Sequence, residues 1–136
     1  MAQIGIRREP DAHEHRVAIV PQSVDILTDA GWAVVVESGA GEDAGFPDQQ
    51  YLDAGATVAD GAAIATSEII LGVAPPTPEY VSGLERGTIV AGFLDPYVDR
   101  PLMEAFARAG VTAVAVEAIP RTTLAQAMDA LSSQTN

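Results

Sequence analysis

The polar side chains best spaced for chemistry lie near the end of the sequence. They are Arg121, Gln126, Asp129 and Ser132. If Thr122 or Thr123 caps a helix there, the last three stand three residues apart on one helix face, and Arg121 can fold back toward it. A guanidinium, an amide and a carboxylate together could hold a neutral carboxamide ring by orientation, without acid–base chemistry. On spacing alone, a solvated face of an amphipathic helix is an equally good interpretation.

Two further charged residues stand where a ligand could reach them. Arg16 precedes an apolar run, and its guanidinium could fork onto a carboxylate or a phosphate. A surface ion pair with Glu14 or Glu9 is the simpler interpretation, and we favour it. Asp95 follows an apolar run and could act as a base, although a cap on a turn is the interpretation we favour.

Two other patterns predict little chemistry. His13 and His15 flank an acid, but no second cluster completes a metal-ligand set, so we expect no metal site. The glycines of Gly39-Ala40-Gly41 are followed by acids that would repel a pyrophosphate, and Gly45 falls one position away from the dinucleotide fingerprint. We therefore interpret this stretch as a structural turn.

Composition narrows the class of protein. The 136 residues suffice for one domain with a real core, and they are 48% hydrophobic. There is no cysteine, which excludes disulfides and thiolate chemistry. The net charge of −12, with arginine as the sole base, disfavours nucleic acid and anionic membranes as partners. No apolar run is long enough to span a bilayer or to act as a signal peptide, so we expect a cytoplasmic protein without membrane insertion.

The elements that must position these residues alternate along the chain. Apolar runs predict strands near residues 2–7, 32–37, 57–58, 69–73, 88–93 and 111–116. Helical patterns follow Pro21, with Val24, Ile26 and Leu27 facing inward, and Asp48, with Tyr51 and Leu52 facing inward. Further helices are predicted at 62–65 and from the capping residue Asp99 to Gly110. This alternation predicts a three-layer, doubly wound α/β domain with a mainly parallel sheet, whose ligand edge lies at the strands' carboxyl ends.

Several stretches, taken in order, resemble one family. They are Ile4–Glu9, Arg16–Pro21, Val36–Gly41, Ser67–Leu71 and Pro120–Gln134. They are similar to the N-terminal domain of the alanine dehydrogenase and proton-pumping nicotinamide nucleotide transhydrogenase family. The resemblance covers nearly the whole chain and implies a Rossmann-like or flavodoxin-like fold over 1–136.

The resemblance also separates two branches of that family. Alanine dehydrogenases bind pyruvate through an Arg, a Lys and a His; Arg16 matches the first, but Gly72 and Asp95 stand where the other two would be. The ending from Pro120 resembles the nicotinamide-binding loop of the transhydrogenase alpha subunit. The resemblance thus implies an oxidoreductase that transfers hydride between NAD(H) here and NADP(H) on a partner domain.

What the resemblance implies for single residues falls on that ending. Arg121 and Gln126 would orient the nicotinamide, while Asp129 and Ser132 would support the loop and the carboxamide. The loop includes the cofactor-binding positions Thr122 and Thr123. Expected partners are a second copy of the chain and the NADP-binding and membrane subunits. In the family a Rossmann domain that carries most NAD contacts follows, and it is absent here, so we expect the isolated chain to bind NAD weakly and to be inactive. A stand-alone regulatory domain and an alanine dehydrogenase fragment remain alternatives.

Overall fold

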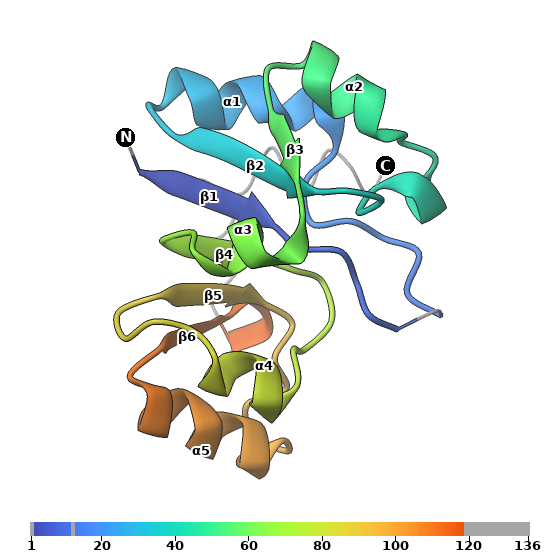
Figure 1. The fold of residues 1–136 in the computed structure, drawn as a ribbon. Helices are drawn as coiled ribbons and strands as arrows, with labels where there is room; N and C mark the ends of the chain where they lie inside the picture. Colours follow the sequence, from blue (N-terminus) through green and yellow to red (C-terminus); the bar gives the residue numbers. More distant parts are fainter. Residues whose placement is uncertain (1, 12, 119–136) are drawn as a thin grey trace.

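The computed structural model describes residues 2–11 and 13–118, and within them six strands form one parallel sheet (Figure 1). The strands are β1 Gln3–Ile6, β2 Ala33–Glu37, β3 Thr57–Ala59, β4 Ile69–Leu71, β5 Ile89–Gly92 and β6 Thr112–Ala115. Their order is β3-β2-β1-β4-β5-β6, and every neighbouring pair runs parallel. The predicted α/β class and parallel sheet are confirmed.

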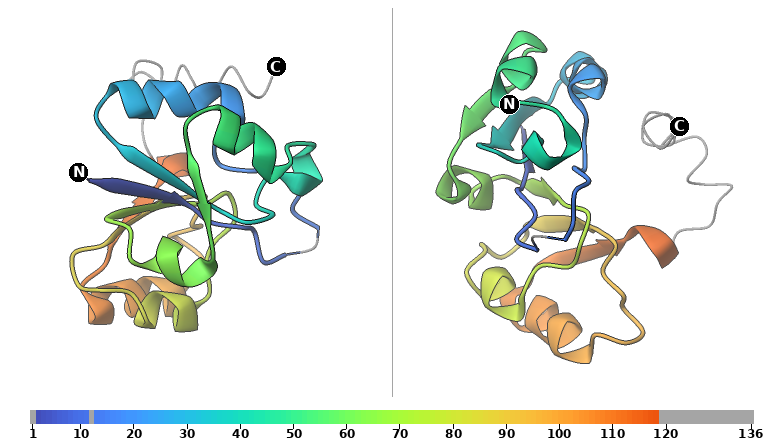
Figure 2. Two further views of the ribbon diagram at one scale, coloured as in Figure 1. Left: turned by 45° about the horizontal axis from the view of Figure 1, so that its top comes forward. Right: turned by 90° about the vertical axis from the view of Figure 1, so that its right-hand side faces the viewer.

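Helices cover both faces of this sheet (Figures 1 and 2). The helices are α1 Val24–Asp29, α2 Asp48–Asp53, α3 Gly61–Ala65, α4 Pro78–Ser82 and α5 Arg100–Ala109, with 3-10 turns η1 Pro21–Ser23, η2 Glu42–Ala44 and η3 Val116–Ala118. Residues of α1 and α2 belong to one core cluster, and residues of α3, α4 and α5 belong to the other. The domain therefore has the predicted three layers.

Strand β2 shows why a continuous apolar run was needed. Val34 and Val36 lie in the core beneath α1 and α2, whereas Val35 lies in the core on the opposite face. Successive side chains of a strand point to opposite faces, so a strand covered on both sides must be apolar at every position.

Two predicted core residues lie outside the core. Ile26 of α1 and Leu52 of α2 are 51% and 46% exposed, so the inward placement predicted for them is wrong. Each helix has only six residues and buries one narrow stripe, which is centred on Val24 in α1 and on Tyr51 in α2. A residue one or two positions away from that stripe is rotated by about 100° or 200° around the helix and faces away from the sheet.

The helix α4 was not predicted, because Pro75, Pro76 and Pro78, which precede it or lie in its first turn, are typical of a stiff loop. Thr77 caps it by accepting a hydrogen bond from the N–H of Tyr80, and Pro78 occupies the first turn, where a proline is tolerated. The predicted boundaries of α5 are confirmed: Asp99 caps it by accepting from the N–H of Leu102, and Gly110 ends it with a φ of +69°. Among the described residues, no helix is long and apolar enough to cross a membrane.

Candidate functional site

The loops at the carboxyl ends of the strands form the candidate site. The strand order changes direction between the neighbouring strands β1 and β4. The carboxyl ends of these two strands are therefore the topological switch point of the sheet. Ligands of doubly wound domains bind in the crevice at this point, because the loops on its two sides leave in opposite directions. The loops that follow β1 and β4 are therefore the first place to look for ligand-binding groups.

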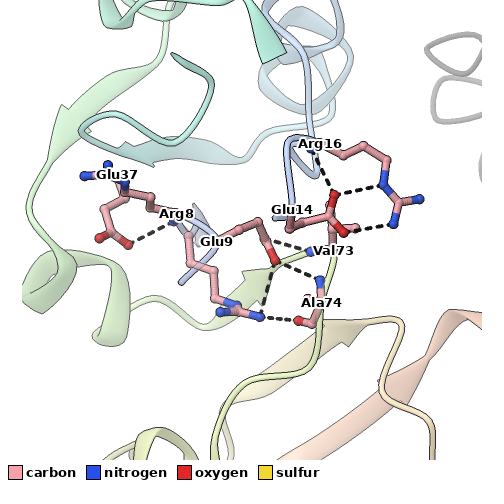
Figure 3. A network of polar contacts seen from close by, with 8 residues as sticks. Arg8, Glu9, Glu14, Arg16, Glu37, Val73 and Ala74 are labelled. Carbon is pink, nitrogen blue, oxygen red and sulfur yellow. Dashed lines mark hydrogen bonds and ion pairs between the residues drawn. The ribbon is translucent and has the colours of Figure 1, made fainter. Parts of the chain in front are cut away.

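A buried ion pair between Arg7 and Glu9 lies at the switch point. Glu9 accepts hydrogen bonds from the N–H groups of Val73 and Ala74, at 2.9 and 2.8 Å (Figure 3). Arg7 lies 3.8 Å from Glu9 and donates to the carbonyl oxygen of Ala74. Both side chains are about 95% buried, with 5% and 4% exposed. The loop after β1 is thus tied to the loop after β4 by the chain's own charges, which sequence reasoning did not predict.

The surroundings of Arg7 are as specific as its partners. Its guanidinium lies 5.9 Å from the centre of the Tyr80 ring, within range of a cation–π contact. A Cβ atom at Gly72 would lie 2.4 Å from the Nε atom of Arg7, so this place on the edge requires glycine. The Nε–H itself is buried and has no hydrogen-bond partner among the described residues.

The carboxylate of Asp48 binds the main chain and side chain of the turn after β2. Asp48 accepts from the N–H of Gly39 at 2.9 Å and from the hydroxyl of Ser38 at 2.7 Å. These two bonds, in that order of effect, lower the pKa of Asp48, with a further contribution from Arg8. Gly41 leaves room for the ring of Tyr51, which a Cβ would meet at 2.7 Å. The glycines therefore serve the turn and its packing, as the sequence predicted.

Arg16 forms the surface ion pair that the sequence favoured. Its Nε and one terminal nitrogen lie 3.0 and 2.9 Å from the two carboxylate oxygens of Glu14 (Figure 3). The pairing lowers the pKa of Glu14 and raises that of Arg16. The guanidinium also lies 6.0 Å from the centre of the Phe93 ring, in the loop after β5. Arg16 thus joins the loop after β1 to the loop after β5.

Asp95 shapes its turn through the main chain. Its φ is +51°, and its carbonyl oxygen accepts from the N–H groups of Val98 and Asp99. Its carboxylate is exposed and makes no hydrogen bond or ion pair with the part of the chain that the structure describes. The turn predicted at Asp95 is present, but its main-chain carbonyl closes it and no hydrogen bond of its side chain does so among the described residues; Asp99 caps α5 as predicted.

Glu117 is the residue that holds Asp95 in place. Its carboxylate accepts from the N–H of Leu94 at 3.2 Å and from the N–H of Asp95 at 2.9 Å. The sequence predicted a ligand edge at the carboxyl ends of the strands, but this contact was not predicted. The available signal was an acid directly after the last strand.

These contacts decide whether the edge fits a dinucleotide. The N–H groups at this edge that could hold a pyrophosphate already donate to the carboxylates of Glu9, Asp48 and Glu117, so they are not free for a phosphate. Within residues 2–11 and 13–118, the edge therefore does not fit the phosphates of NAD. No group of three potential metal ligands, including His13 and His15, gathers within those ranges either.

The residues predicted to contact a nicotinamide lie outside the described residues. They are Arg121, Thr122, Thr123, Gln126, Asp129 and Ser132. In the sequence they follow η3.

Fold and edge together define a class: a doubly wound, all-parallel α/β domain whose loops at the carboxyl ends are braced by internal carboxylates. Comparison with known families narrows this class. Residues 5–136 match the N-terminal domain family of alanine dehydrogenase and PNT, and the chain belongs to that family.

The relatives fall into both branches of the family. The chain is 38% identical, over 98% of its length, to the NAD(P) transhydrogenase subunit alpha of Haemophilus influenzae, of which it covers 26%. A transhydrogenase structure from Sinorhizobium meliloti superposes with a TM-score of 0.87 at 43% identity, over 97% of this chain and 40% of that one. An L-alanine dehydrogenase structure superposes with a TM-score of 0.78 at 35% identity, over 83% of this chain and 32% of that one. The chain thus spans about a quarter of the curated relative.

Proposed function

We propose that this chain is the N-terminal domain of an NAD(P) transhydrogenase alpha subunit, which transfers hydride between NAD(H) and NADP(H) and is coupled to proton translocation. The observation that carries the proposal is the likeness to transhydrogenases, which is higher in identity, coverage and TM-score than the likeness to alanine dehydrogenase. The absence of lysine from the sequence further supports it, because the pyruvate site of alanine dehydrogenases requires one.

The proposed site residues follow β6. Arg121 and Gln126 orient the nicotinamide of NAD(H), and Asp129 supports the loop. Thr122 and Thr123 belong to the binding loop, and Ser132 supports the carboxamide. The coenzymes supply the hydride chemistry, and the chain's own residues supply alignment, so no general base is needed.

The proposal assigns partners as well. NADP(H) is bound by a partner subunit, the membrane subunits carry the proton coupling, and the chain forms a homodimer on the cytoplasmic side. A separate Rossmann domain holds most of the NAD. The binding of NAD by a separate domain is supported by the hydrogen bonds at the carboxyl ends of the strands. There, carboxylates of the chain already accept from the N–H groups that a pyrophosphate would need.

Hydride transfer in the complete alpha subunit, assembled with its NADP-binding partner, tests the proposal. Arg121→Ala and Gln126→Ala should each lower the rate from NADH to an NADP analogue while largely preserving NADH binding. Arg86→Ala, on the far side of the domain after α4, serves as a control for removing an arginine and should leave the rate unchanged. Alanine-dependent NADH formation would support the alanine dehydrogenase alternative instead. Absence of both reactions would support a non-catalytic domain.

A second experiment concerns the isolated chain. Calorimetric titration of residues 1–136 with NADH should give no binding in the micromolar range. Micromolar affinity would contradict the assignment of most NAD contacts to a separate domain.

A further inference from the structure

Glu117 joins the chain that leaves β6 to the end of β5. Its two carboxylate oxygens accept one hydrogen bond each, from the N–H groups of Leu94 and Asp95. Partial burial of the carboxyl opposes its ionisation, but the N–H groups of Asp95, of Glu117 itself and of Leu94 outweigh that effect and lower its pKa. The group is therefore an anion at neutral pH, and the bridge consists of charge-assisted hydrogen bonds.

The sheet register explains why this bridge exists. Gly92 pairs with Ala115, so a continued ladder would bring residue 117 opposite Leu94. The chain enters η3 at Val116 and its carbonyl groups leave the ladder. The side chain of Glu117 then accepts from the N–H of Leu94, which a continued ladder would have bonded to the main chain after β6, and also from the N–H of Asp95. The carboxylate thus supplies the acceptor that the N–H of Leu94 would otherwise find in the main chain after β6.

The partner of this bridge is itself firmly held. The carbonyl oxygen of Asp95 accepts from Val98 and Asp99 at 3.1 and 2.9 Å, which closes the turn after β5. On the other side, the exposed ring of Phe93 lies 6.0 Å from the guanidinium of Arg16. Glu117 therefore ties the end of β6 to a turn that its own main-chain hydrogen bonds close.

We propose that Glu117 is a positioning residue for the proposed hydride transfer, because it ties the last described turn before Arg121 in the sequence to the loop after β5. Arg121 follows Glu117 by only four residues. This inference rests on the proposed function.

The test uses Glu117→Gln in the complete alpha subunit with its NADP-binding partner. Glutamine keeps the size of the side chain, but its NH2 group would face one of the two N–H donors and cannot accept from it. We expect hydride transfer from NADH to an NADP analogue to slow by roughly ten- to a hundredfold, as small misplacements do. The Kd of NADH should change little, since the substitution touches no phosphate contact, and the Tm should fall only by the amount that the loss of one hydrogen bond explains.

Glu104→Gln is the matched control. Glu104 is an exposed residue of α5 that pairs with Arg100 and Arg108 at 3.9 and 3.6 Å, so the same charge is removed away from the edge. We expect the control to transfer hydride at the unsubstituted rate.

Three results would overturn the proposal. The first is a Glu117→Gln protein with an unchanged rate, which leaves the proposed function intact. The second is a slower rate matched by an equal loss of NADH affinity, or by a Tm lowered far beyond the loss of one hydrogen bond, because Glu117 would then be a structural residue only. The third is an unsubstituted assembly without hydride transfer, which refutes the proposed function as well.

Discussion

Replacing Gly72 with alanine should expose how tightly the switch point is packed. A Cβ atom at this position would lie 2.4 Å from Nε of Arg7 and 3.0 Å from its Cζ. Neither the main chain at Gly72 nor the side chain of Arg7 can move freely. The N–H of Gly72 donates to Ala91 at 3.1 Å, and the guanidinium of Arg7 is held by Glu9 and by the carbonyl of Ala74.

The expected cost follows from these contacts. Overpacking a tight site costs about 1–3 kcal/mol. Displacing Arg7 would also weaken its pairing with Glu9, and the loss of a partner in a buried ion pair costs about 3–5 kcal/mol. Since Gly72→Ala displaces the guanidinium without removing it, we expect a loss of about 2–4 kcal/mol. For a domain of this size, that loss lowers Tm by roughly 6–12 °C.

Urea unfolding followed by circular dichroism measures this loss, and a double-mutant cycle assigns its cause. In an Arg7→Ala background the collision is absent, so Gly72→Ala should change the free energy of unfolding by less than about 0.5 kcal/mol. Gly83→Ala is the control, because a Cβ there meets its nearest atom at an ordinary 3.6 Å. A neutral Gly72→Ala, or an equal cost with and without Arg7, would show that Gly72 and Arg7 are not packed against each other as described.

Two further predictions concern hydrogen bonds and pH. Tyr51→Phe removes a buried 2.7 Å bond to the carbonyl of Ile19 and should cost about 1–3 kcal/mol in urea unfolding. Burial raises the pKa of Tyr51, so the folded state favours the neutral phenol; stability should fall above pH about 10, less steeply in Tyr51→Phe. Asp48→Asn weakens the bonds from Gly39 and Ser38 and should cost about 1 kcal/mol at pH 7. Because the pKa of Asp48 is lowered, this contribution is present above pH about 4 and lost below it; equal acid unfolding of variant and parent would contradict the assignment.

Elements with a strong local pattern were predictable. The run Val34–Val36 could only be a strand covered on both faces, and Asp99 and Gly110 marked the ends of α5 by their own capping chemistry. Short helices were less predictable. In α1 and α2 the buried stripe is so narrow that the pattern alone did not separate Ile26 and Leu52 from the core.

The sequence by itself determined the class of fold and the family. It also singled out the stretch from Arg121 onward, because periodicity, caps and ordered motifs are local properties of the chain. Only the tertiary structure decided which charges meet. Glu9 reaches Val73 across 64 positions and Glu117 reaches Leu94 across 23, because parallel strands bring distant loops to one edge. Pairings of this kind depend on strand order and register, which no spacing within a single loop reveals.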